Sequence, residues 1–362
     1  MTSPHPTPAP QPAPWWSAGP VTLHVGDAHD VLAAMPDASV DCIVTSPPYW
    51  GLRSYDTGQW HGGRADCDHD AAPSPAGAHQ ARTCSECGAV WTDGQYGQEP
   101  TVGEYVDRLV TVFDQARRVL HPQGTLWLNL GDSYAGTGPR AARPHGSNSI
   151  IGGNYNHRQW TPGAVAGLRP KNLIGVPWRV ALALQSTNNW ILRNAAVWLK
   201  TNGQPSSARD RLTTTYEMVF LLTRSPRYFF DLDAIRIPLK NPNDRRLRPS
   251  AGTRTGSGGT RGHDPTRPRG KNPGDVWPYP TRPLREAHFA AYPIEIPLRC
   301  IAAGCRPEGT VLDPFSGAAT TGLAALQLGR RYVGVDLSSQ YAALAKRRLL
   351  SQLPELGEAA DD

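Results

Sequence analysis

A buried strand that two consecutive prolines bring to an abrupt end constrains the fold of this 362-residue chain more than any other feature. Residues 40–44 form an apolar run typical of a strand inside a sheet, and a Ser-Pro-Pro-Tyr turn at 46–49 follows it. Proline fixes φ and has no N–H, so the two prolines end the strand and keep the turn extended. A carbonyl and the Ser46 hydroxyl can then accept hydrogen bonds, and Tyr49 supplies a flat face. The turn therefore suits an aromatic amine held at a strand end.

A second strand end, near the other end of the chain, has the pattern of a nucleotide-binding turn. Residues 310–313 indicate a strand that ends in Asp313, and small residues fill the turn before a helix that begins at Thr320. Small residues let a ligand approach the backbone, and a helix N-terminus offers free N–H groups. The next strand ends in Asp336, where an acidic residue reaches a ribose in nucleotide-binding β-α-β units. The chain has no Gly-x-Gly-x-x-Gly motif and no Walker lysine, which argues against a dinucleotide or a nucleoside triphosphate.

Strand and helix patterns alternate along most of the chain, which predicts an α/β fold in one large domain. We expect this domain over residues 20–350, between a disordered tail at 1–19 and an acidic tail at 351–362. Irregular insertions interrupt it at residues 56–100, 134–170 and 238–288. Between the first two we expect a helix at 102–120, a closing turn at 121–124 and a strand at 125–130.

The two strand ends resemble motifs of the amino-methyltransferases of DNA. The turn at 46–49 matches (D/N/S)-P-P-(Y/F/W), and residues 313–321 match the S-adenosylmethionine motif D-P-F-x-G-S-G-T-T except at Ala318 and Ala319. Further similar blocks lie between them, at 120–132, 174–179 and 190–200. The order, with the Ser-Pro-Pro-Tyr motif first, is that of the circularly permuted beta class. The resemblance implies a Rossmann-like S-adenosylmethionine-dependent methyltransferase, with a mostly parallel sheet, helices on both faces and irregular insertions.

The resemblance also implies roles for individual residues. Asp313 would orient the methionine end of S-adenosylmethionine, Asp336 the ribose hydroxyls, and Asp27 the adenine amino group. The alternative for Asp27 and Asp336 is a helix cap or an exposed strand-end turn. Ala319 replaces a glycine of the motif and costs backbone freedom. The candidate catalytic residues are Ser46, Pro47, Pro48 and Tyr49, and the candidate cofactor-binding residues are Asp27, Phe289, Pro293, Asp313, Phe315, Gly317, Thr320, Thr321 and Asp336.

The chemistry of the turn indicates an exocyclic amine of a DNA base. Ser46 and the carbonyl of Pro47 would accept its N–H bonds and aim the nitrogen at a sulfonium methyl group. Tyr49 would stack on a base flipped out of the duplex, whereas we expect Trp50 to pack in the core. The chain has no Pro-Cys dipeptide, which cytosine carbon-5 methylation conventionally needs. Serine at the first motif position is typical of the cytosine-N4 branch; adenine N6 is an alternative, and so is an inactive DNA-binding module.

Four residues of the first insertion have the pattern of a structural zinc site. Cys84 and Cys87 form a C-x-x-C-G knuckle, and Cys67 and His69 lie upstream. The insertion holds too few apolar residues to fold unaided, which favours a metal. Two further histidines of the insertion could replace His69 as a ligand: His61 and His79. The alternative to zinc is a set of reduced thiols or a redox pair.

Charge and composition favour a nucleic-acid partner. The formal net charge is +6, and eight arginine or lysine residues lie between 245 and 271 in the third insertion. They suit phosphate contacts to duplex DNA, and the alternative is a solvated loop. The sequence shows no apolar leader and no apolar run of membrane length, so we expect a cytoplasmic protein with reduced thiols. A restriction endonuclease of the same system could be a partner without direct contact.

Overall fold

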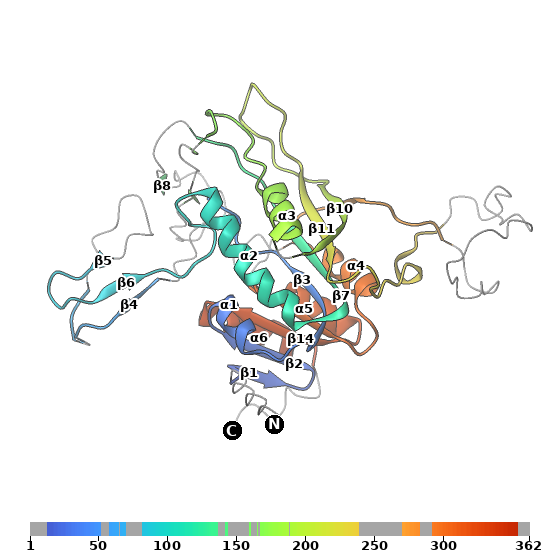
Figure 1. Ribbon diagram of the computed structural model, residues 1–362, viewed down its shortest axis with the longest axis horizontal. Coiled ribbons are helices and arrows are strands. Elements are labelled where there is room, and N and C mark those ends of the chain that lie inside the picture. The colour runs from blue at the N-terminus through green and yellow to red at the C-terminus, as the bar shows by residue number, and fades with distance from the viewer. Residues whose placement is uncertain are drawn as a thin grey trace, which may run out of the picture.

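The computed structural model describes residues 13–51, 58–64, 66–69, 82–136, 142–143, 159–160, 165, 167–187, 189–238, 270–282 and 292–353. Several predicted features lie outside these ranges: Phe289, His79, the start of the N-terminal tail, most of the C-terminal tail, and the arginines between 245 and 269. Figure 1 shows helices packed on a central sheet, with a small sheet of β4, β5 and β6 standing away from it.

A nine-stranded mixed sheet forms the centre of the described structure. In spatial order its strands are β1 (Trp16–Ala18), β2 (Val21–Val25), β14 (Arg331–Asp336), β13 (Thr310–Asp313), β3 (Val40–Thr45), β7 (Leu120–Leu130), β11 (Tyr216–Thr223), β10 (Ile191–Lys200) and β12 (Val276–Tyr279). β2, β14, β13, β3 and β7 run parallel, and β11 is antiparallel to β7. The predicted mostly parallel sheet is confirmed. Strands from the two ends of the chain lie side by side in it, as circular permutation implies.

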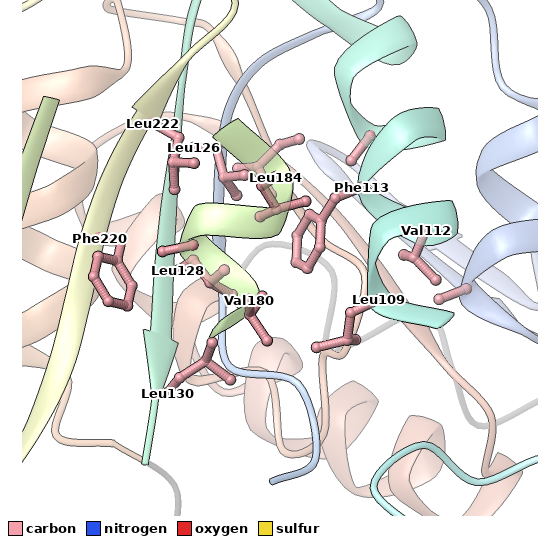
Figure 2. Packing of buried hydrophobic residues seen from close by; sticks show 14 of the residues in the cluster. Leu109, Val112, Phe113, Leu126, Leu128, Leu130, Val180, Leu184, Phe220 and Leu222 are labelled. Carbon is pink, nitrogen blue, oxygen red and sulfur yellow. The ribbon is translucent and has the colours of Figure 1, made fainter. Parts of the chain in front are cut away.

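Helices cover both faces of the sheet, because the side chains of successive strand residues alternate between the faces. α1 (Ala28–Ala34), α2 (Val102–Val119) and α3 (Val176–Thr187) pack on one face, and α4 (Glu295–Gly304), α5 (Thr320–Gln327) and α6 (Ser339–Leu350) on the other. In β7, Leu126, Leu128 and Leu130 lie toward α2 and α3 (Figure 2), whereas Trp127 belongs to the opposite core. Each fully buried leucine contributes about 1.5–3 kcal/mol, so the strand ends are held on a rigid base.

The chain between 102 and 130 differs from the prediction. α2 ends at Val119 and β7 already begins at Leu120, so residues 121–124 are not a turn that closes the helix. The pairing of β7 with β3 jumps from Leu120 to Thr125, and the residues between them bulge out of the ladder. Pro122 cannot donate to a ladder, which accounts for a bulge at this place.

Two segments that we expected to be irregular contribute edge strands, and the predictions are wrong there. β1 lies within the expected tail at 1–19 and pairs antiparallel with β2, because Trp16 packs on the core. β12 lies within the stretch 238–288 and pairs parallel with β10. Pro278 obscures β12 in the sequence, but an edge strand tolerates proline because one of its sides needs no donors.

Smaller elements surround the main sheet. β4 (Gln59–His61), β6 (Val90–Thr92) and β5 (Arg82–Thr83) form a three-stranded sheet, β8 (Ala142–Arg143) pairs with β9 (Gln159–Trp160), and η1 (Asp233–Ile235) is a short 3-10 helix. Residues 95–99, which are buried, connect β6 to α2. Across the described ranges, no helix has the length and apolar character needed to span a bilayer.

Candidate active site

A cavity of about 470 Å³ lies at the carboxyl ends of the parallel strands. Ser46 follows β3, Gly131 follows β7, and Asp336 ends β14. The edge of the sheet at which these strands end therefore forms the floor of the cavity. Most of the predicted residues line it: Ser46, Pro47, Pro48, Tyr49, Asp313, Phe315, Gly317, Thr320 and Asp336. The fold therefore brings the turn near the N-terminus and the turn near the C-terminus to one shared cavity.

Asp313 joins the two turns. Its carboxylate accepts hydrogen bonds from the Thr45 hydroxyl at 2.6 Å, the Thr321 hydroxyl at 2.6 Å and the Phe315 N–H at 3.1 Å. Thr45 ends β3, the neighbour of β13, so the first bond connects positions 268 residues apart. Burial raises the pKa of Asp313 to about 6, although these donors act in the opposite direction. Thr321 lies behind the cavity wall, where its hydroxyl also bonds to that of Tyr292.

The Asp336 carboxylate holds the turn between β13 and α5 (residues 314–319) in place. It accepts the N–H of Gly317 at 2.8 Å and the N–H of Ser338 at 2.8 Å. Burial raises the pKa of Asp336 to about 6, and the nearby charge of Asp313 adds to the rise. Ala319 has a left-handed backbone (φ 55°), which costs an alanine about 1–2 kcal/mol. The backbone cost expected from alanine in place of the motif glycine is therefore present at Ala319.

Asp27 lies one layer behind the cavity wall. Its carboxylate caps α1 by accepting the His29 N–H at 2.8 Å, and it accepts the Tyr96 hydroxyl at 2.9 Å. Arg108 lies 3.5 Å from the same carboxylate and over the Tyr96 ring. Tyr96 itself lines the cavity, with its ring edge-on to Phe315. The helix-cap alternative for Asp27 is observed, its contact with an adenine stays a prediction, and Tyr96 is a wall residue that sequence reasoning missed.

The predicted cofactor motif around residue 290 is described only in part. Phe289 lies outside the described residues, and Pro293 precedes α4, where its carbonyl accepts the N–H of Ile296 at 3.0 Å. Tyr292, beside Pro293, lines the cavity, and burial raises the pKa of its phenol well above the usual value. In this segment Tyr292 forms the wall, and Pro293 positions the helix behind it.

A chain of hydrogen bonds extends from Ser46 away from the turn between β13 and α5. The Ser46 hydroxyl lies 3.2 Å from the Tyr49 oxygen and 3.3 Å from Asn129 Oδ1. The Tyr49 hydroxyl donates to Glu217 Oε2 at 2.5 Å, and Lys200 Nζ donates to Glu217 Oε1 at 2.5 Å. Glu217 and Lys200 line the cavity. Sequence reasoning missed Asn129, Lys200 and Glu217. The available signal was that each of them is a polar residue near one end of a mostly apolar strand.

This network determines which part of Ser46 faces a ligand. The Asn129 amide donates through Nδ2 to the Met218 carbonyl at 3.1 Å, so its Oδ1 is turned to Ser46. Burial raises the pKa of Tyr49 well above its usual value, and the charge of Glu217 adds to the rise. The phenol therefore stays protonated and donates a hydrogen bond to Glu217. The Ser46 proton is then directed to Asn129 or Tyr49, which leaves the lone pairs of its oxygen as acceptors.

Tyr49 and Trp50 occupy different environments. The Tyr49 ring lines the cavity and packs so closely on Gly131 that a Cβ there would lie 2.6 Å from the ring. Trp50 is 2% exposed and donates its Nε1–H to the Glu99 carbonyl at 3.0 Å. Core packing of Trp50 is confirmed, and stacking of Tyr49 on a base stays a prediction.

The four predicted zinc ligands come together away from the cavity. The ligand atoms of Cys67, His69, Cys84 and Cys87 all lie within 4.8 Å of one another. The sulfurs of Cys67 and Cys84 are 3.8 Å apart, a separation that two Zn–S bonds of about 2.3 Å span in tetrahedral geometry. Backbone hydrogen bonds at Ala89 and Arg64 lower the pKa of Cys87 to about 6, whereas burial raises the pKa of Cys67 to about 12, so Cys87 is the cysteine that favours the thiolate. The donor set therefore fits a zinc ion.

Comparison with known proteins extends the likeness over the whole domain. A family model described as DNA methylase, for N6 and N4 methyltransferases, matches residues 40–347. The type II methyltransferase M.SmaI of Serratia marcescens is 37% identical over 326 residues, which cover 90% of this chain and 89% of that protein. M.Cfr9I of Citrobacter freundii, also a type II methyltransferase, is 37% identical over 329 residues, covering 91% and 87%. The solved PvuII DNA methyltransferase, described as cytosine-N4-specific, shares the fold with a TM-score of 0.57 and 14% identity, covering 95% of this chain and 94% of that one.

Proposed function

This chain belongs to the N6/N4 DNA methylase family of S-adenosylmethionine-dependent methyltransferases, and we propose that it methylates the exocyclic N4 of cytosine in duplex DNA. One observation carries the proposal: the Ser-Pro-Pro-Tyr turn and the turn between β13 and α5 share a cavity, and the bond between Thr45 and Asp313 joins them. A methyl donor on one side of this cavity and an amine on the other would meet inside it.

Two carboxylates and a wall residue without a side chain support S-adenosylmethionine as the ligand of the cofactor half of the cavity. When bound, the cofactor supplies an electrophilic methyl group on a positively charged sulfur. Asp313 is buried, Asp336 is partly buried, and both carboxyls have raised pKa values, so a cationic ligand would lower the free energy of their charged forms. Gly317 offers a wall without a side chain, and Phe315 and Thr320 complete it. We assign the ribose hydroxyls to Asp336 and the methionine end to Asp313.

Ser46 and the Pro47 carbonyl hold the amine in this proposal. An aromatic amine is a weak nucleophile because its lone pair is delocalised into the ring. Two acceptors for its N–H bonds favour a pyramidal nitrogen whose lone pair is aimed at the methyl group. Ser46 is suited to accept because its own proton is directed to Asn129 or Tyr49. In the transfer an N–C bond forms, a C–S bond breaks, and the nitrogen releases a proton.

Serine at the first position of the turn supports cytosine as the target. The family includes both N4 and N6 enzymes, so membership alone does not choose between them. The PvuII enzyme, which shares the fold, is cytosine-N4-specific. Adenine N6 is the second candidate, because the same two acceptors could hold its amine.

Nucleoside mass spectrometry tests the proposal. Purified protein is incubated with labelled S-adenosylmethionine and duplex DNA of varied sequence, and N4-methylcytosine is the expected product. Ser46→Ala should lower the rate about 10²–10³-fold, as loss of one positioned hydrogen-bond partner does. Ser186→Ala, which changes an exposed serine of α3, is the control and should not alter the rate. N6-methyladenine would assign adenine instead, and DNA without either product would contradict the proposal.

We also propose that Cys67, His69, Cys84 and Cys87 bind a structural zinc ion, supported by the clustering of their ligand atoms. Elemental analysis should find one zinc equivalent in the parent protein and a loss of it in Cys84→Ser. Cys300→Ser, which changes a thiol buried in the main core, should keep the metal. Equally low zinc in the parent and in Cys84→Ser would contradict this site.

The type II relatives favour a role in restriction-modification, with an endonuclease of the same system as an indirect partner. The basic stretch between 245 and 271 is our candidate for phosphate contacts to duplex DNA. Methylation-aware sequencing of a host that expresses the chain should show methylation at one recognition sequence. Methylation scattered without a shared sequence would contradict a site-specific enzyme.

A further inference from the structure

Lys200 forms an ion pair with Glu217 in the cavity and has no part in the chemistry assigned so far. Lys200 ends β10, Glu217 lies near the start of β11, and both line the cavity with the Ser-Pro-Pro-Tyr turn. Their side chains are only 24% and 12% exposed. Desolvation of two such charges often costs more free energy than their attraction supplies, so the pair is a poor source of stability. A mostly buried pair in the wall of a cavity points to a ligand.

The geometry leaves the Lys200 ammonium with donors for that ligand. Lys200 Nζ donates to Glu217 Oε1 at 2.5 Å, and the second carboxylate oxygen accepts the Tyr49 hydroxyl at 2.5 Å. Within the described part of the chain, Glu217 is the one hydrogen-bond partner of Nζ, and the centre of the Trp198 ring lies 5.1 Å from it. An ammonium has three N–H bonds, so Glu217 orients Lys200 and uses one of them.

Ser46 and Lys200 are the two ends of one chain of contacts, which runs through Tyr49 and Glu217. A flipped base whose amine lies on Ser46 turns the rest of its Watson–Crick edge along the same wall. After its amine, cytosine presents two acceptors on that edge, N3 and O2. Adenine presents one acceptor, N1, and then a C–H group. A cationic donor at the far end of the wall therefore matches cytosine.

We propose that Lys200, oriented by Glu217, donates a hydrogen bond to O2 of the flipped cytosine and so selects cytosine over adenine. The inference rests on the proposed function, because it requires the amine to lie on Ser46. It adds the residue that recognises the part of the base that is not methylated.

Synthetic duplexes that differ in one target base test this inference. They carry the sequence that the parent methylates, with cytosine, 2-thiocytosine or adenine at the target position. 2-Thiocytosine keeps the amine and N3 but has sulfur, a weak acceptor, in place of O2. The parent should show a kcat/KM about tenfold or more lower on 2-thiocytosine than on cytosine, the effect of one hydrogen bond to a charged group. Lys200→Met should lose about 10- to 100-fold on cytosine and treat the two pyrimidines alike.

Three controls accompany the test. Lys200→Arg should keep part of the preference for cytosine over 2-thiocytosine, because arginine is also a cationic donor. Lys171→Met removes an exposed lysine whose Nζ lies 2.6 Å from Asp210, and it should match the parent. The Kd of Lys200→Met for S-adenosylmethionine should also match that of the parent, which shows that the variant is folded.

The inference is overturned if Lys200→Met keeps the preference of the parent for cytosine over 2-thiocytosine, or if the parent has no such preference. The product formed by the parent on the natural duplex tests the proposed function separately. N4-methylcytosine together with an unchanged preference in Lys200→Met would overturn the role of Lys200 alone.

Discussion

The cofactor end and the base end of the cavity are built in different ways. At the cofactor end, the Asp336 carboxylate holds the backbone N–H groups of Gly317 and Ser338, beside the side-chain bonds that Asp313 makes. At the base end, the Tyr49 hydroxyl donates to Glu217 across 168 residues, and the bonds that lead from Ser46 through Tyr49 and Glu217 to Lys200 join side chains. A backbone turn depends on few side-chain identities, whereas a network of side chains fails when one member is changed. We therefore expect substitutions at the two ends to affect different steps.

The largest effect is expected at the base end, from Glu217→Gln. The amide removes the negative charge that faces the Lys200 ammonium in a mostly buried site. Breaking such an ion pair costs about 3–5 kcal/mol of stability. The single-turnover rate of methyl transfer to DNA should fall about 10²–10³-fold, while the Kd for S-adenosylmethionine stays unchanged. Asp210→Asn breaks an exposed pair with Lys171 and should leave the rate unchanged. Weakened cofactor binding together with a normal transfer rate in Glu217→Gln would contradict the expectation that the two ends affect different steps.

The next largest effect is expected at the cofactor end, from Asp336→Asn. The amide oxygen can still accept the Gly317 N–H, but the charge that we assign to the ribose hydroxyls is lost. Isothermal titration should show a Kd for S-adenosylmethionine about 10- to 100-fold higher, since a hydrogen bond to a charged group contributes about 1.5–3 kcal/mol. Binding of duplex DNA should not change. An unaltered cofactor Kd would contradict the assignment of Asp336.

Acid should weaken cofactor binding by about tenfold from about pH 8 to about pH 5. The pKa values of Asp313 and Asp336 are raised to about 6, so both carboxyls are charged above this pH and become neutral below it. Since these folded-state pKa values exceed the usual value of 3.8, the two groups lower the stability of the free protein as pH rises from about 4 to about 6. Titrations across the range check the sign, and the pH dependence should shrink in Asp336→Asn. Tighter binding at low pH would contradict the role of the charged forms.

The smallest effect is expected from Ala319→Gly, which should raise the free energy of unfolding by no more than about 1 kcal/mol. Glycine relieves the left-handed backbone at this position, but the gain is offset by the greater freedom of the unfolded chain and by the loss of a buried methyl group. Urea unfolding measures the difference. Ala318→Gly, at a buried neighbour without a positive φ, should instead destabilise the protein. A larger loss from Ala319→Gly than from Ala318→Gly would contradict the strain at 319.

The contrast between the two ends also explains what the sequence could predict. Ser46, Asp313 and Asp336 stand in contiguous motifs at strand ends, so local patterns placed them at the edge of a parallel sheet. Lys200 and Glu217 meet through the pairing of β10 with β11, and no local pattern identifies them as one side of a ligand site. Long-range packing decides which polar strand-end residues face the cavity.

Two further differences have local causes. Tyr96 lies just beyond the cysteine knuckle in the polar segment 93–99, so no local apolar pattern indicates that it is buried. Pro278 made β12 read as irregular, because a proline excludes a central strand but not an edge strand. For Tyr96 and Pro278 alike, the contacts that decide the role of the residue are made by distant parts of the chain.

The most direct test of the central claim is a paired measurement on Ser46→Ala: its Kd for S-adenosylmethionine and its single-turnover rate of methyl transfer to DNA. One cavity with separate amine and cofactor ends predicts a normal cofactor Kd together with transfer about 10²–10³-fold slower than in the parent. Transfer at the parental rate, or loss of cofactor binding in the same proportion as loss of transfer, would contradict it.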